Sequence, residues 1–315
     1  MKFIFFTGKG GVGKSTIAAA AAWQLAQRHR VLIVSLDPAH NLGDIFGVPL
    51  DDRATPFGEN LFLREVNLER RSRAYLEREI AVLTETYRYV ESLNLDSYFS
   101  ILKYSPGLEE YALITSIEEI LRNDQGYDYI VFDTPPTGLT LRFLALPRVT
   151  ITWIDSLIGL RRVILKKRHT VRKILGEPKP GPEAEGKAGA YTARYDEKED
   201  RVLGRLLEMR ARYGALHEEL QGERCTIVVV FNPDRLSLRE SERLIAGFQA
   251  LNFPVRLFVD NKVTPENQDI AGQVETALRA RVNGVIQERV PLVESIRAAQ
   301  DARLFDVGQD LTAHL

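Results

Sequence analysis

Short apolar runs bounded by turn residues recur along the chain and predict strands. They are apolar at both even and odd positions, which is typical of strands covered by helices on both faces of a parallel sheet. Helical patterns lie between several of them, so strand and helix alternate. Right-handed crossovers then give an α/β fold with a doubly wound, mostly parallel sheet. The expected strands are 3–7, 31–35, 129–133, 226–231 and 255–259, and two of the expected helices are 16–28 and 238–251.

Two long stretches, 67–124 and 150–221, lack strand signals and interrupt this alternation. Their apolar side chains recur at three- and four-residue spacing, which predicts helices. We expect them to form a helical subdomain inserted into the sheet domain. Within the second stretch, 177–194 is rich in Pro, Gly, Glu, Lys and Ala and has little to bury, which predicts a flexible loop. The sheet domain would then consist of 1–66, 125–149 and 222–315.

The composition of the 315 residues is that of a globular protein, and it limits the classes of partner that the protein is expected to bind. The 42 Lys and Arg nearly balance the 43 Asp and Glu, so the overall charge gives no reason to expect a nucleic-acid partner. No run of eighteen apolar residues occurs, and the N-terminal run 3–6 is too short for a signal-peptide core. We therefore expect a cytoplasmic protein whose membrane contact, if any, is peripheral.

The strongest chemical signal is GKGGVGKST, directly after the first expected strand and directly before the first expected helix. It satisfies the phosphate-binding pattern GxxxxGK[ST] in its required context. Glycines let the backbone N–H groups turn inward around phosphate oxygens, and the helix N-terminus adds a positive dipole. Lys14 is expected to bridge the β- and γ-phosphates, Ser15 to ligate Mg²⁺, and Thr16 to reach the α-phosphate. The other predicted nucleotide-binding residues of the loop are Gly8, Gly10, Gly11, Val12 and Gly13.

Two acidic residues follow expected strands and would lie at the same sheet edge as this loop. Asp37 is placed to orient an attacking water, with a turn-initiating Asp-Pro as the alternative. Asp133 follows a hydrophobic strand, as in a Walker B element, and is expected to hold Mg²⁺. Thr137 and Gly138, just behind it, would form a switch that senses the γ-phosphate.

Asn261 comes after the expected strand 255–259, where a side-chain amide can read a purine base. The run Asn261-Lys262-Val263-Thr264 lacks the aspartate of the NKxD pattern of GTPases. This difference favours adenine over guanine. The alternative is an exposed asparagine in a turn.

Four segments together resemble one family: GKGGVGKST, DPAHNLGDIFG, FDTPPTGLTLRFL and the pair NPDRLSLRESERLI with VDNK. They are similar to the ArsA-like ATPases of arsenite pumps and tail-anchored-protein targeting, within the class that includes MinD and the nitrogenase iron protein. The resemblance implies a P-loop NTPase fold and a Mg-ATP-driven switch. With one copy of the loop per chain, it also implies a homodimer.

The resemblance also assigns roles to single residues. Lys9 would be the deviant Walker A lysine that crosses the dimer interface to the partner's nucleotide, with a solvated loop lysine as the alternative. Lys9, Lys14 and Asp37 would be the catalytic residues. Asn41 would belong to switch I, and Asn261 would read adenine. The loop on the other side of the adenine would include Pro291 and Leu292.

The chain departs from the family pattern in two ways. Leu139 stands where the second switch usually has a histidine, so coupling to the helical subdomain is expected to differ. Cys225 is the only cysteine, which excludes the paired-cysteine zinc site of many targeting members and an arsenite site built from three thiolates of one chain. We therefore expect ATP and Mg²⁺, but no zinc, as cofactors.

An apolar stripe in the second helical stretch is the candidate contact for a client. In targeting members of the family this region forms an apolar groove for a transmembrane segment. Basic residues flank the stripe, so an anionic bilayer surface is a second possible partner, and packing into the core is the plain alternative. The stripe contains Ile154, Leu157, Ile158, Ile164 and Leu165.

Three functions therefore follow from the sequence. The first is a homodimeric ATPase whose open/closed switch binds and delivers a hydrophobic, membrane-protein client. The second is the catalytic subunit of an anion or arsenite efflux pump, which requires a membrane partner. The third is a MinD-like regulatory ATPase, which the acidic and poorly amphipathic C-terminal sequence disfavours.

Overall fold

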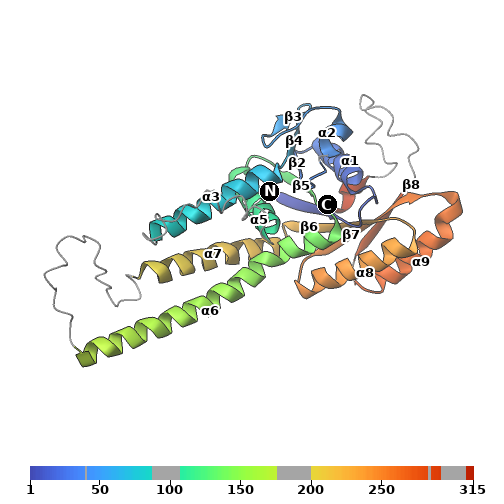
Figure 1. Ribbon diagram of the computed structural model, residues 1–315. Coiled ribbons are helices and arrows are strands. Elements are labelled where there is room, and N and C mark those ends of the chain that lie inside the picture. The colour runs from blue at the N-terminus through green and yellow to red at the C-terminus, as the bar shows by residue number, and fades with distance from the viewer. Residues whose placement is uncertain (40, 87–106, 176–199, 283–284, 292–309) are drawn as a thin grey trace. The chain divides into compact units, whose positions relative to one another are not determined.

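The computed structural model describes residues 1–39, 41–86, 107–175, 200–282, 285–291 and 310–315. Their strands form one eight-stranded sheet in the order β3-β4-β2-β5-β1-β6-β7-β8 (Figure 1). All neighbouring strands are parallel except β3 and β4. The predicted α/β fold with a doubly wound, mostly parallel sheet is confirmed. The strands are β1 (Lys2–Thr7), β2 (Val31–Ser35), β3 (Thr55–Pro56), β4 (Leu61–Glu65), β5 (Tyr129–Asp133), β6 (Cys225–Phe231), β7 (Val255–Val263) and β8 (Ile286–Pro291).

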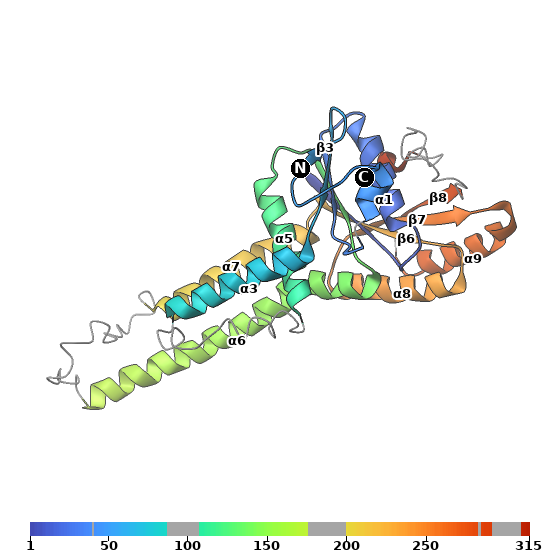
Figure 2. The ribbon, with the colours of Figure 1, turned by 45° about the horizontal axis from the view of Figure 1, so that its top comes forward.

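Helices cover both faces of the sheet. The crossover from β1 to β2 and the crossover from β6 to β7 run toward opposite edges, so right-handed connections place their helices on opposite faces. Figure 2 shows α1 on one face and α8 with α9 on the other. The helices are α1 (Lys14–Ala26), α2 (Asn41–Phe46), α3 (Leu68–Thr86), α5 (Leu108–Asn123), α6 (Thr137–Leu175), α7 (Arg201–Gln221), α8 (Arg235–Ala250) and α9 (Gln268–Arg279), with 3₁₀ turns η2 (Pro265–Asn267) and η4 (Leu311–His314).

The core lies where the central strands meet α1. Small side chains let this helix approach the sheet closely, and Ala18–Ala22 are all buried. On the other face of the sheet, the rings of Phe5 and Phe132 stack with centroids 4.8 Å apart, which ties β1 to β5. These two strands carry the predicted phosphate loop and Asp133 at their ends. The core therefore fixes the relative position of the two motifs.

Three strands were not expected from the sequence. In β4 the side chains alternate between buried and partly exposed, so its run is not continuously apolar. The edge strand β8 has the polar sequence IQERVP, and β3 contains two residues. Edge strands tolerate polar residues because one side of the strand has no neighbour. The five expected strands are all present, and β7 continues four residues beyond its predicted end.

The helix predicted at 238–251 begins at Arg235, because Asp234 caps its N-terminus. The carboxylate of Asp234 accepts the N–H of Ser237 at 2.7 Å. Ser237, the residue directly before the predicted start, lies inside the first turn of the helix. Its hydroxyl instead accepts the N–H of Asn232 at 3.0 Å.

The chain divides into two compact units, 1–146 with 219–315, and 147–218. Helices α3 and α5 belong to the first unit, and the second contains most of α7 and the larger part of α6. Pro147, inside α6, lies at the boundary, where its ring removes one helical hydrogen bond. The single inserted subdomain expected from the sequence stays a prediction. The loop predicted at 177–194 lies outside the described residues.

One segment of the described chain, Thr137–Lys167 in α6, is long and apolar enough to cross a membrane. Length and composition are the sole basis for this finding, and core helices of water-soluble proteins pass the same test. One third of its most apolar window is buried.

Candidate nucleotide-binding site

The loop GKGGVGKST joins the end of β1 to the start of α1, as the sequence predicted. Two glycines in it are required by close approaches. A Cβ at Gly8 would lie 2.1 Å from the carbonyl oxygen of Val230, and a Cβ at Gly13 would lie 2.4 Å from Nδ2 of Asn261. Gly13 also has φ 91°, and its carbonyl accepts the N–H of Ile17 at 3.0 Å to begin α1. The positive end of α1 therefore starts inside the loop.

Lysines 9 and 14 of this loop have different surroundings. Lys14, the first residue of α1, is buried, whereas Lys9 is half-buried. Within the described residues, Lys9 has no hydrogen bond or ion pair in its own chain. Gly10 and Gly11, on either side of the loop's midpoint, are exposed. A lysine of this kind is available to contact a molecule outside the chain.

Buried polar atoms gather where the ends of β1, β2 and β5 meet. Asp133 is opposite Ser35 of β2 and Phe6 of β1 in the sheet register. In the described structure neither carboxylate oxygen of Asp133 has a hydrogen-bond partner, and the hydroxyls of Thr7 and Ser35 have none either. Buried polar groups normally have partners, so three strand ends with unpartnered oxygens favour a bound polar group or cation here.

Burial raises the pKa of Asp133 from its usual value to about 7. The hydroxyl of Ser15 and the ammonium of Lys14 act against this rise, and the carboxylate of Asp37 adds to it. The predicted phosphate-loop residues and both acidic residues are thus close enough to influence one another. A fully buried carboxylate beside a serine hydroxyl is a donor set that suits Mg²⁺, because this ion prefers oxygen ligands and keeps several waters. Among the described residues, no group of three or more His, Cys, Asp or Glu forms a complete protein cage for a metal.

Asp37 follows β2 and holds its own turn in place. Its Oδ1 accepts the N–H of Ala39 at 3.0 Å, and the preceding N–H of Leu36 donates to the Asp133 carbonyl at 2.8 Å. The turn leads into α2, whose Gly43 N–H donates to Oε1 of Glu65 at 2.8 Å. Glu65 was not among the residues predicted from the sequence. Its position at the end of a strand could have identified it, but the strand in question, β4, was itself not expected from the sequence.

Asn41 is the first residue of α2, and its side chain lies outside the described structure, as does all of residue 40. The predicted place of Asn41 beside the loop after β2 is therefore given by the backbone alone.

Thr137 and Gly138, predicted to form the second switch, begin α6 immediately after β5. Two hydroxyls that the sequence did not single out hold this corner. Thr134 donates to the Phe6 carbonyl at 2.9 Å, and Thr140 donates to the Pro135 carbonyl at 2.7 Å. The first turns of α6 are thereby tied to β1 and β5.

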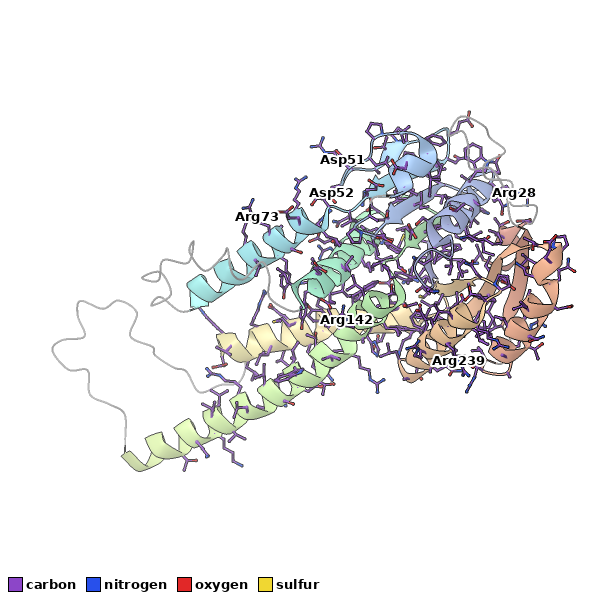
Figure 3. All side chains as sticks on the ribbon, turned by 45° about the vertical axis from the view of Figure 1, so that its right-hand side comes forward. Arg28, Asp51, Asp52, Arg73, Arg142 and Arg239 are labelled. Atoms are coloured by element: carbon purple, nitrogen blue, oxygen red, sulfur yellow. The ribbon has the colours of Figure 1, made fainter. Side chains whose placement is uncertain are left out.

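The same turns of α6 contact two other helices of the first unit. Arg142, labelled in Figure 3, pairs with Glu110 of α5 at 3.3 Å. Leu141 lies so close to Gly247 of α8 that a Cβ there would come within 2.8 Å of it. These contacts connect the start of α6 directly to α5 and α8. Leu139, where the family pattern has histidine, is half-buried.

Asn261 lies within β7, not after the strand as the sequence predicted. Polar residues 260–262 end the apolar run, yet they continue the strand. The amide of Asn261 is buried and donates from Nδ2 to the Val12 carbonyl at 2.7 Å. The structure thus brings Asn261 to the phosphate loop. Pro291 ends β8, beside β7, and Leu292 lies outside the described residues.

The five residues predicted to meet a client lie on different sides of α6. Ile154, Ile158 and Leu165 are buried in a cluster with Leu203 and Tyr213 of α7. Leu157 is exposed and Ile164 is half-buried. In this conformation the first three pack into the core between two helices, so they are not available to a client. A separate stripe is exposed, made of Val149, Trp153, Leu157, Leu160 and Val163.

A parallel sheet whose first strand leads through GKGGVGKST into a helix, with a buried aspartate at the end of the neighbouring strand, defines a P-loop NTPase. Comparison with known families narrows this class. The model of the anion-transporting ATPase family (ArsA ATPases) matches residues 1–283. The chain therefore belongs to the ArsA ATPase family, as the sequence motifs predicted, and it is an ATPase.

Individual relatives bear names from both branches of this family. The chain is 29% identical over 269 residues to an arsenical pump-driving ATPase of Aquifex aeolicus, covering 85% of this chain and 82% of the relative. It is 30% identical over 295 residues to an arsenical pump-driving ATPase of Chlorobaculum tepidum, covering 91% of this chain and 68% of the relative. It is 28% identical over 286 residues to ATPase GET3B of Arabidopsis thaliana, covering 84% of this chain and 64% of the relative.

Proposed function

We propose that this chain is a cytoplasmic homodimeric ATPase in which Mg-dependent ATP hydrolysis drives an open/closed switch that binds and delivers a hydrophobic, membrane-protein client. The observation that carries the ATPase part is the unpartnered carboxylate of Asp133, buried beside the phosphate loop. The observation that supports the client part is the exposed apolar stripe on α6.

The chain's own residues divide the chemistry among them. The loop's N–H groups and Lys14 bind and orient the phosphates, and Asp37 holds the attacking water opposite the leaving group. Ser15 and Asp133 would hold Mg²⁺, which when bound neutralises negative charge that develops on the phosphate oxygens. Asn261 and Pro291, which ends the neighbouring strand β8, would bind the base. Asn41, Thr137 and Gly138 would transmit the state of the γ-phosphate.

Two variants separate binding from hydrolysis. Lys14→Ala removes the phosphate-binding charge, so we expect ATP binding to be lost in equilibrium titrations. Asp37→Asn keeps the size and the Asx turn but removes the carboxylate, so we expect ATP binding to remain and phosphate release to fall roughly 100-fold. Wild-type turnover of Asp37→Asn would show that the water is oriented by another group.

The dimer part of the proposal is supported by Lys9. Its side chain is half-buried in the phosphate loop, and in the described part of its own chain it pairs with nothing. A cation held there without a counter-ion is suited to a phosphate presented by a second copy. We therefore assign Lys9 to the nucleotide of the partner subunit.

The client part is supported by the geometry of α6. The stripe Val149, Trp153, Leu157 and Leu160 advances by four, four and three residues, so these side chains share one helix face. Trp153 is 69% exposed, which is unusual for so large an apolar side chain. The adjacent face carries the exposed residues Arg148, Arg162 and Lys166. An apolar stripe with basic residues beside it is a surface to which a hydrophobic helix can bind.

Capture of a hydrophobic helix tests the client part. A purified single-span membrane-protein tail is offered to the protein with ATP and with ADP, and co-elution is measured. We expect capture to depend on the nucleotide and to fall roughly tenfold in Leu160→Glu. Leu236→Glu, at an exposed leucine of α8, is the matched control and should capture normally. Absence of capture with either nucleotide would contradict the client part and leave the ATPase part standing.

A catalytic subunit of an anion pump is the second candidate, because relatives from Aquifex aeolicus and Chlorobaculum tepidum are named arsenical pump-driving ATPases. Stimulation of turnover by arsenite or antimonite tests it. The single thiol, Cys225, is fully buried in β6, and burial raises its pKa. A thiol in this state is a poor metalloid ligand. We therefore expect no stimulation, and a clear rise in turnover would favour the pump.

A further inference from the structure

Two consecutive carbonyl groups of the phosphate loop accept hydrogen bonds from adjacent side chains of β7. Nζ of Lys262 donates to the Gly11 carbonyl at 2.8 Å. Nδ2 of Asn261 donates to the Val12 carbonyl at 2.7 Å. The two side chains thus hold neighbouring peptide groups of the loop from one strand.

These contacts fix the direction of the loop's N–H groups. The described peptide bonds are all trans, and in a trans peptide the carbonyl and the N–H point in opposite directions. A donor on the Gly11 carbonyl therefore fixes the N–H of Val12, and a donor on the Val12 carbonyl fixes the N–H of Gly13. A phosphate-binding loop needs its N–H groups to point inward. Donors on the outward carbonyls prepare the loop before the nucleotide arrives.

The backbone of β7 is distorted where the two side chains arise. The register with β8 shifts between Asp260 and Val263. Lys262 has φ 61°, a left-handed conformation that costs a lysine free energy and a glycine very little. That a lysine rather than a glycine occupies this conformation indicates a functional role for its side chain.

Hydrogen bonds hold this distorted segment in one conformation. The N–H of Lys262 donates to Oδ1 of Asn261 at 2.9 Å, which orients the amide so that Nδ2 faces the loop. On the other side, Nδ2 of Asn267 donates to the Lys262 carbonyl at 3.0 Å. The lysine and the asparagine are therefore presented to the loop by a fixed backbone.

We infer that Lys262 is a positioning residue of the nucleotide site, which together with Asn261 holds the phosphate loop in its binding conformation. The inference rests on the proposed nucleotide site. ADP and ATP use the same loop, so the effect falls on the affinity for both. The lysine is half-buried, and water competes for part of its hydrogen bond. The expected effect is accordingly moderate.

Three substitutions at Lys262 test this role through two measurements: the affinity for ADP and ATP, and the thermal midpoint of the nucleotide-free protein. Lys262→Met keeps the stem and loses the donor, so both nucleotides should bind about fivefold to tenfold more weakly. Lys262→Gly should lose the same affinity, yet its midpoint should equal or exceed that of the wild type because the left-handed backbone is relieved. Lys262→Arg keeps a donor and should bind within about threefold of the wild type.

Asn252, two residues after the end of α8, supplies a matched control because it also has a positive φ, 57°. Asn252→Gly makes the same backbone change far from the loop in sequence. Its midpoint should equal or exceed that of the wild type, and its nucleotide affinity should be unchanged. A purely structural role for Lys262 predicts instead that affinity and midpoint fall together.

The inference is overturned if Lys262→Met and Lys262→Gly bind both nucleotides within about twofold of the wild type. It is also overturned if Lys262→Gly loses thermal stability together with affinity. Lys14→Ala separates this failure from a failure of the proposed site. If Lys14→Ala binds as the wild type does, the loop is not the nucleotide site. If it loses binding while the Lys262 variants keep theirs, the inference about Lys262 alone is wrong.

Discussion

At the scale of single residues, Asp133 carries a large electrostatic cost. Its side chain is fully buried, and its oxygens have no hydrogen-bond partner among the described residues. An ionised carboxylate in such a place is unfavourable unless a cation or donors compensate it. The sequence identified this residue through its position after a hydrophobic strand. Its burial depends on the packing of β1, β2 and β5 around it, which no local pattern encodes.

Replacing Asp133 by asparagine separates stability from function. Asp133→Asn keeps the shape and removes the buried charge, so without Mg²⁺ we expect the variant to be more stable than the wild type by about 1–3 kcal/mol. ATP hydrolysis should fall roughly 100-fold or more, because the variant no longer supplies an anionic ligand. Urea unfolding in EDTA and phosphate-release assays check the two parts. A variant that is both less stable and inactive would mean that Asp133 has a structural role.

At the scale of elements, the sequence predicted α6 as helical but did not show which of its sides packs. The helix has two apolar sides, because Ile154 and Ile158 lie on one and Trp153 and Leu157 lie on the other. A search for apolar residues with a period of 3.6 finds both sides. Which of the two sides is buried depends on where α7 packs against α6. The predicted client stripe mixed the two sides for this reason.

Alanine substitutions on the two sides of α6 should therefore have different effects. Ile158→Ala removes a buried side chain from the cluster with α7, and we expect a loss of about 2–4 kcal/mol in the stability of the second unit. Leu157→Ala removes an exposed side chain, and we expect a change within about 0.5 kcal/mol. Hydrogen exchange of α7 amides measures both. Equal losses would show that the two sides are buried alike in solution.

Strand prediction succeeded in the centre of the sheet and failed toward its edges. Buried central strands such as β1 and β5 are apolar on both faces and are readily found. The strands β4 and β8 carry polar residues because they lie nearer the edges, where solvent is within reach. Polar residues within a strand also explain why Asn261 and Lys262 were not assigned to β7. Their polarity suggested that β7 had ended, although they are the residues that β7 presents to the phosphate loop.

At the scale of the whole molecule, the sequence led to the family through the order and spacing of its motifs, and the family model confirmed it over 1–283. What the chain acts on is not encoded in those motifs. The sheet, the loop and the two acidic residues serve any member of the family. The exposed stripe on α6 and the buried Cys225 are the features that bear on this question. They favour a hydrophobic client over a thiol-bound metalloid.

The central claim is that two copies of the chain complete each other's ATP sites, and complementation between two inactive variants tests it most directly. Lys9→Ala should be inactive because no lysine reaches the partner's nucleotide, and Lys14→Ala should be inactive because its own loop does not bind ATP. In a mixed dimer, the intact loop of the Lys9→Ala chain receives Lys9 from its Lys14→Ala partner. We predict that an equal mixture regains about a quarter of wild-type ATP turnover, since half of the dimers are mixed and each has one complete site. A mixture no more active than the two variants measured separately would contradict the claim.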